Sequence, residues 1–111
     1  MTIQYADTAR RDLHAVYEFI AYTLQRPDRA ETVSVDIMRE IRSLTSFTKR
    51  YQRYQKEPWL SMDVRYTEAD KYLIFYMFHE QTKTVRIIRI LYGGSDVEHQ
   101  LEETVDWGYL N

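Results

Sequence analysis

Residues 71–96 read KYLIFYMFHEQTKTVRIIRILYGGSD, and this stretch decides the fold. It holds two apolar runs, Tyr72–Phe78 and Val85–Tyr92, which are separated by a short polar link. Aromatic and β-branched residues joined by so few polar ones predict an antiparallel hairpin. Both runs are too apolar for strands with two solvent-exposed faces. We therefore expect the hairpin at the centre of a sheet that has at least one face covered by other elements. The Gly93-Gly94 pair predicts a turn that ends the second strand.

The N-terminal part of the chain predicts a strand followed by two helices. Residues 3–5 alternate between apolar and polar, which is a short strand signal. Apolar residues then recur every three or four positions from Thr8 to Leu24, which predicts an amphipathic helix with Asp7 as its N-cap. Pro27 interrupts this helix, and a second apolar stripe predicts another helix over residues 30–47. Two helices joined by so short a break predict an antiparallel helical hairpin.

The remaining segments complete an α+β order. Residues 48–58 are polar, basic and aperiodic and are predicted to form a loop. Loose alternation predicts a strand over Trp59–Tyr66, and residues 67–71 should form the turn into the central hairpin. A helix of one or two turns is predicted from Val97 to Val105. The order is β-α-α-β-β-β with a short terminal helix, in one domain spanning residues 1–111.

Composition and charge exclude several classes of protein. The absence of cysteine excludes disulfides, thiolate nucleophiles and cysteine metal sites. No apolar run has the length of a signal or transmembrane segment, so we expect a cytoplasmic protein without a membrane partner. The net charge of -2 does not favour nucleic acid. Residues 42–56 are basic and residues 95–111 are acidic, so the two segments either attract each other or serve different partners.

Three segments give the chain a family resemblance: DLHAVYEFIAYTL in the first helix, Arg65 followed after a short turn by KYLIFY, and VRIIRILYGGSD near the end. In this order and spacing, the chain resembles the RelE/ParE superfamily of toxins from bacterial type II toxin–antitoxin systems over nearly its whole length. The resemblance implies a small, mainly antiparallel four-stranded sheet covered by the helical hairpin. It also implies a hetero-oligomer with an antitoxin that wraps the toxin. Such toxins act either as DNA gyrase poisons, in the ParE branch, or as ribosome-dependent mRNA endonucleases, in the RelE branch.

The chemistry of RNA cleavage weakens the RelE interpretation. Attack through the 2'-hydroxyl requires a base, cations for the phosphate and an acid for the leaving group. If the protein is a nuclease, the resemblance implies Arg65 and Arg89 as its basic residues, and Tyr92 is the candidate for stacking or proton donation because it ends a strand. Two further cationic positions of that branch fall on Leu73 and on Gly94 or Ser95, which cannot replace a guanidinium. We therefore favour the ParE branch.

Several of these residues also have structural interpretations. Arg86 and Arg89 are three positions apart in a predicted strand and should point to opposite faces. We expect one of them to be buried against a carboxylate in a structural ion pair. Tyr92 lies at a strand end, where it either stacks, donates a proton or caps the core.

The histidines and the C-terminal carboxylates are weaker candidates for chemistry. His79 and His99 are possible acid–base residues, but exposed or locally bonded side chains are the favoured interpretation. Asp96 and Glu98 lack a clustered histidine, so we interpret them as charges at the N-terminus of the last helix. No metal or other cofactor is expected.

The loop over residues 48–59 mixes basic and aromatic side chains. Such a mixture binds phosphates and stacks on bases, or it binds a protein, because aromatic and arginine residues dominate protein hot spots. The structural alternative is a solvated connection that is packed by its own tyrosines. The acidic net charge favours a protein partner. The candidate partner-binding residues are Tyr51, Arg53, Tyr54, Trp59 and Trp107.

The sequence thus predicts a toxin of a type II module that inhibits growth by binding an essential target, DNA gyrase, and is neutralised by a cognate antitoxin. One alternative is a ribosome-dependent mRNA interferase that acts on ribosome-bound message. The other is a toxin fold that has lost toxicity and survives as an antitoxin-binding or regulatory module.

Overall fold

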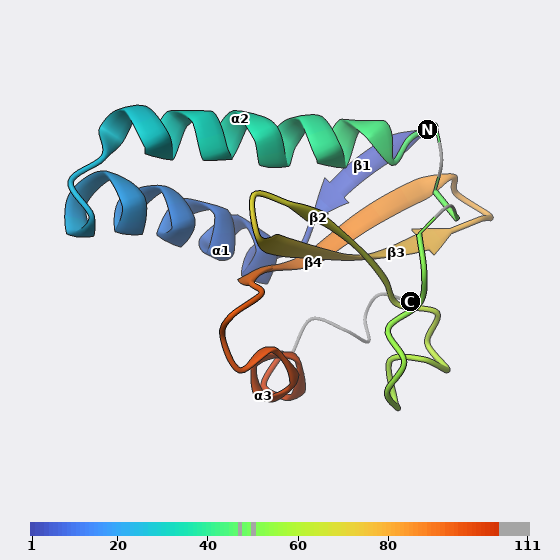
Figure 1. Cartoon of the computed structure of the whole chain (residues 1–111). Helices are drawn as coiled ribbons and strands as arrows, with labels where there is room; N and C mark the ends of the chain where they lie inside the picture. Colours follow the sequence, from blue (N-terminus) through green and yellow to red (C-terminus); the bar gives the residue numbers. More distant parts are fainter. Residues whose placement is uncertain (47, 50, 105–111) are drawn as a thin grey trace.

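A computed structural model describes residues 1–46, 48–49 and 51–104 of the chain (Figure 1). The order of its strands and α-helices agrees with the order predicted from the sequence. The elements are β1 (Thr2–Tyr5), α1 (Asp7–Glu18), the π-helix η1 (Phe19–Thr23), α2 (Pro27–Ser43), β2 (Arg65–Ala69), β3 (Tyr72–His79), β4 (Thr84–Tyr92) and α3 (Val97–Glu102).

The four strands form one sheet in the order β1-β4-β3-β2. Strand β3 pairs antiparallel with both β2 and β4, whereas β1 pairs parallel with β4 (Figure 1). The predicted central hairpin is therefore confirmed as β3 and β4, and the sheet is mainly antiparallel as expected.

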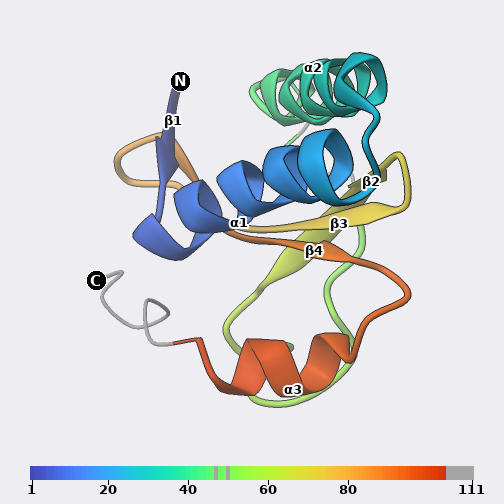
Figure 2. The ribbon, with the colours of Figure 1, turned by 90° about the vertical axis from the view of Figure 1, so that its left-hand side faces the viewer.

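Both faces of the sheet are covered, but by different elements. Figure 2 shows α1 and α2 on one side of the sheet and α3 on the other. On the first side, which we call the helical face, Ile74, Tyr76, Ile87 and Ile90 belong to a buried cluster with apolar residues of α1 and α2. On the second side, the α3 face, the buried cluster is made of Trp59, Val64, Phe75, Leu91 and Leu101. This double burial explains the near-continuous apolar runs of β3 and β4.

The predicted position of β2 is wrong. The strand runs from Arg65 to Ala69, whereas residues 59–63 form hydrogen-bonded turns. The turn into β3 contains only Asp70 and Lys71, which both have positive φ. Such a two-residue turn matches the twist of a hairpin, so pairing extends to Ala69 opposite Tyr72.

The predicted helical hairpin is present, with corrected ends. Ala6, and not Asp7, is the N-cap of α1, because the Ala6 amide still bonds to β4 and the helix follows at once. Helix α2 begins at Pro27, where the missing amide costs nothing, and ends at Ser43, earlier than predicted. At α3, Asp96 caps the helix by accepting a bond from the His99 amide, which confirms its interpretation as an N-terminal charge.

A β-bulge in β4 changes the direction of its two arginines. Met77 pairs with Arg86 and Phe75 pairs with Arg89, while Ile88 is the extra residue of the bulge. Residues two apart in β3 share a face, so their partners do as well. Both arginines therefore belong to the α3 face, and the prediction that they point to opposite faces is wrong.

Tyr76→Phe is expected to lower the free energy of unfolding by about 1 kcal/mol at neutral pH. The Tyr76 hydroxyl donates to the Thr48 carbonyl over 2.8 Å and ties the loop to β3. Burial raises the pKa of Tyr76 to about 12, above the value of about 10 in an unfolded chain. The neutral hydroxyl thus stabilises the fold fully below about pH 10, and this contribution is lost as the pH rises through about 12. Urea unfolding between about pH 8 and pH 12 should show the stability advantage of the wild type shrinking above about pH 10 and then reversing, and a constant difference would contradict this account.

Candidate functional site

A groove of about 670 Å³ opens between the helical hairpin, the end of β4 and α3. Its long wall is the face of α1 and η1 from Asp12 to Leu24, a rise of roughly 18 Å in a regular helix. The lining is largely apolar, and the described residues that form it are Asp12, Ala15, Val16, Phe19, Ile20, Leu24, Arg29, Val33, Asp70, Tyr72, Ile90, Leu91, Tyr92, Ser95 and Gln100. An apolar groove with a few polar groups at its margin is a typical binding site.

Three large side chains of this groove are exposed to a degree unusual for their size. Phe19 is 50%, Leu24 52% and Tyr92 51% exposed, and Tyr22 of η1, which does not line the groove, is 71% exposed. The π-turn of η1, closed by the Leu24 amide donating to the Phe19 carbonyl, presents two of them. Such turns are frequent at functional sites. A contiguous apolar surface of this kind indicates a site for another molecule.

Two tyrosines form the wall opposite α1. The rings of Tyr72 and Tyr92 lie 5.8 Å apart, and burial raises the pKa of Tyr72. A Cβ at Gly94 would lie 2.5 Å from the Tyr92 ring, so the glycine leaves room for this ring position. The turn after β4 therefore shapes the groove.

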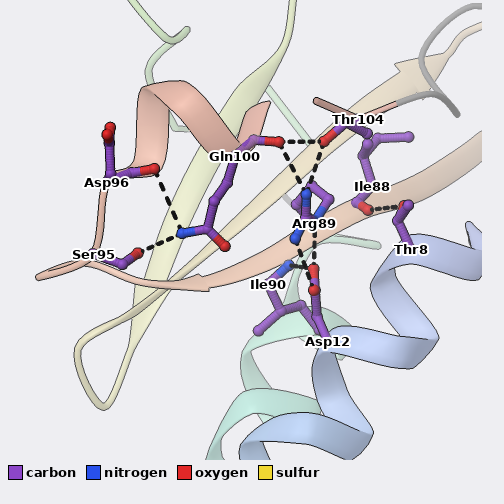
Figure 3. A network of polar contacts seen from close by, with 9 residues as sticks. All are labelled: Thr8, Asp12, Ile88, Arg89, Ile90, Ser95, Asp96, Gln100 and Thr104. Carbon is purple, nitrogen blue, oxygen red and sulfur yellow. Dashed lines mark hydrogen bonds and ion pairs between the residues drawn. The ribbon is translucent and has the colours of Figure 1, made fainter. Parts of the chain in front are cut away.

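The carboxylate at one end of the groove is fully engaged inside the protein (Figure 3). Asp12 of α1 binds Arg89 through two hydrogen bonds of 2.7 and 2.9 Å, and it also accepts the Ile90 amide. Arg89 in turn donates to the Gln100 carbonyl and to the Thr104 hydroxyl. The expected structural ion pair is confirmed at Arg89, where it joins α1, β4 and the end of α3.

The other end of the groove carries a cluster of charges between α2 and the β2–β3 turn. Arg29 lies 3.7 Å from Asp70, and Arg39 lies 3.0 Å from Asp36. The neighbouring Asp36 carboxyl, together with burial, raises the pKa of the Asp70 carboxyl, while the contact with Asp70 lowers the pKa of Asp36. Of these two carboxyl groups, that of Asp70 is therefore the more readily protonated.

The structure does not bring Arg65, Arg89 and Tyr92 together. Arg65 pairs with Tyr76 and thus belongs to the helical face, whereas Arg89 belongs to the α3 face. The Arg65 guanidinium donates to the Tyr51 carbonyl over 2.8 Å and lies 3.1 Å from Asp63. Tyr92 lies at the opposite end of the sheet, in the groove. Both guanidinium groups thus bind protein groups.

The aromatic residues proposed for partner binding turn inward. Trp59 is buried, and Tyr54 packs on it with ring centres 5.7 Å apart. Tyr51 is half-buried against the helical-face core. Arg53 alone of these four is exposed, 3.9 Å from Asp63. Trp107 lies outside the described residues.

The remaining candidate residues take local roles. His99 lies 3.3 Å from Glu103 on the same helix, and His79 ends β3 opposite Thr84. Lys56 contacts Glu98 at 2.7 Å, so the basic loop and the acidic C-terminal segment attract each other at this point. Within residues 1–46, 48–49 and 51–104, no group of three or more His, Asp or Glu side chains could hold a metal ion, and no helix could span a membrane.

Sequence reasoning did not identify the groove. Phe19 and Tyr22 make the apolar stripe of the first helix wider than one buried face requires. This excess of apolar residues was the signal in the sequence for an exposed apolar surface on the helix. The opposite wall depends on where the turn after β4 and α3 place Tyr92 and Gln100, which no local pattern encodes.

Comparison with known proteins gives a family and two structural relatives. A family model described as "ParE toxin of type II toxin-antitoxin system, parDE" matches residues 3–97. A chain of the chromosomal ParDE toxin–antitoxin system from P. aeruginosa has a TM-score of 0.67 and 21% identity, covering 83% of this chain and 95% of that one. A chain of the RelBE2 toxin–antitoxin complex from Mycobacterium tuberculosis has a TM-score of 0.59 and 20% identity, covering 82% and 95%. No curated protein matches.

Proposed function

The chain belongs to the ParE toxin family of type II toxin–antitoxin systems, and from this we propose that it arrests growth by binding DNA gyrase in the cytoplasm and is neutralised by a cognate antitoxin. The observation that carries the antitoxin half of this proposal is the open apolar groove along α1. Phe19, Leu24 and Tyr92 in this groove are each about half exposed. Exposure of so much apolar side-chain surface to water is unfavourable for a protein that has no partner. A partner segment that fills the groove would bury them in a hetero-oligomer.

Binding, and not hydrolysis, is the action that the arrangement of arginines supports. Phosphate neutralisation in an RNA cleavage site requires cations that face the substrate. Arg65 and Arg89 instead face backbone carbonyls and carboxylates of the protein, on opposite faces of the sheet. Leu73 and Ser95 supply no replacement charge. The mRNA interferase is therefore the less favoured function.

Inducible expression in bacteria, alone and with the upstream open reading frame, tests the proposal. We expect growth arrest, filamentation and a DNA damage response with translation intact, and relief of all three by the co-expressed upstream protein. Early translation arrest with message cut in the ribosomal A site would overturn the gyrase target. Unimpaired growth would overturn toxicity itself.

Tyr92→Phe separates the two modes of action within the same experiment. The Tyr92 side chain is exposed, so loss of its hydroxyl should change the stability by less than about 0.5 kcal/mol. If the protein acts by binding, growth inhibition should stay within about threefold of the wild type. A nuclease that uses this hydroxyl as a proton donor would lose about 100-fold or more in rate, and inhibition would largely disappear.

A further inference from the structure

Among the charged residues that line the groove, one has hydrogen-bond donors to spare. Asp12 is engaged by Arg89 and by the Ile90 amide. Asp70 lies 3.7 Å from Arg29, and its buried Oδ2 has no hydrogen-bond partner in the described part of the chain. Among the described residues that line the groove, Arg29 is the single cation, and the exposed Leu24 lines the groove with it.

The Arg29 guanidinium is held loosely. Its contact with Asp70 measures 3.7 Å, which is longer than a hydrogen bond, and no hydrogen bond links its side chain to any other residue in the described part of the chain. The side chain is 51% exposed. The protein therefore leaves a planar, charged donor group at the margin of an apolar surface, a combination suited to bidentate binding of a carboxylate.

We propose that Arg29 selects the antitoxin: the antitoxin segment that fills the groove carries apolar side chains against Phe19 and Leu24 and an Asp or Glu carboxylate that binds Arg29. This inference rests on the proposed function and adds the chemistry by which the partner is recognised. Charge complementarity carries it, because the apolar walls accept many sequences while a partly desolvated cation discriminates against a basic or neutral one. Closure of the groove over Arg29 strengthens this discrimination by removing water.

The test uses the full chain and the protein encoded by the upstream open reading frame, with affinity measured by calorimetry. Arg29→Glu should lower the affinity of the complex about 30-fold. A higher salt concentration should reduce this difference in affinity between the variant and the wild type. Arg10→Glu is the matched control, because Arg10 is exposed, pairs with Asp7 at 3.5 Å and lies outside the groove. It should change the affinity less than about twofold.

A charge reversal in the partner identifies the contact. Peptides tiled along the upstream protein locate the segment that binds, and each of its Asp and Glu residues is changed to Lys in the full-length partner. One of these changes should weaken binding to the wild type and restore binding to Arg29→Glu, but not to Arg10→Glu.

The outcomes separate this inference from the proposed function. A wild-type complex that is insensitive to Arg29→Glu, or that no charge reversal restores, would overturn the role of Arg29 and leave neutralisation by the partner in place. No complex between the wild-type proteins would overturn neutralisation, and the inference with it.

Discussion

Asp12→Ala is expected to lower the free energy of unfolding by about 3 kcal/mol. Asp12 and Arg89 have side chains that are only 14% exposed, and their hydrogen bonds are short and bidentate. Removal of the carboxylate leaves the largely buried Arg89 guanidinium without an anionic partner. The Ile90 amide loses its acceptor in the same step. Because some solvent still reaches the pair, the expected cost lies at the lower end of the range for buried ion pairs.

Two further variants test the cause of this loss. The double variant Asp12→Ala/Arg89→Met should be more stable than Asp12→Ala alone, because no unpaired charge remains. Asp7→Ala is the control: it removes an exposed carboxylate from the same helix, 3.5 Å from its arginine, and should cost about 0.5 kcal/mol. Urea unfolding at neutral pH gives all three values. If Asp12→Ala cost no more than Asp7→Ala, the Asp12–Arg89 pair would not be what holds α1 to β4.

Leu24→Asp is expected to weaken the complex with the antitoxin at least about 100-fold, which corresponds to about 2.7 kcal/mol. Leu24 lines the groove at the tip of the helical hairpin with about half of its surface exposed, so the free protein tolerates a polar side chain there. In the complex we expect the same position to be desolvated, so a carboxylate there loses its hydration. Because Arg29 lines the same groove, the new carboxylate also competes with that of the partner for this guanidinium.

Val35→Asp is the matched control for this prediction. Val35 of α2 is a 45% exposed apolar residue, similar to Leu24 in exposure, but it lies outside the groove. Its replacement should leave the affinity within about threefold, and both variants should unfold close to the wild type. Equal losses for the two variants would place the antitoxin elsewhere.

The extent to which the sequence determines this fold differs from element to element. The central hairpin is predicted by the apolar runs of β3 and β4, and its cover by the apolar stripes of α1 and α2. Both predictions succeed because burial of one or two faces requires apolar residues in a recognisable pattern along the sequence. The position of β2 was missed because Asp70 and Lys71 form a tight turn without the usual Asn-Gly or Asp-Gly sequence. The bulge at Ile88 also has no local signal, and it decides the direction of Arg89.

The candidate site was less accessible to sequence reasoning. An ion pair at one arginine of β4 was predicted, but its partner, Asp12, is 77 residues away and is fixed only by the packing of α1. The aromatic residues of the basic loop gave the pattern of a binding surface, yet Tyr54 and Trp59 are used to build the second core cluster. Composition shows which side chains a segment contains. The direction in which those side chains point depends on the face of the sheet against which the segment packs.

The most direct test of the central claim, that this toxin acts by binding gyrase and not by hydrolysing message, is DNA cleavage by purified gyrase in the presence of the purified chain. We predict that cleaved DNA accumulates with added protein, that it does not accumulate when gyrase is left out, and that the upstream protein abolishes the effect. Unchanged gyrase activity, together with cleavage of ribosome-bound message by the same preparation, would contradict the account.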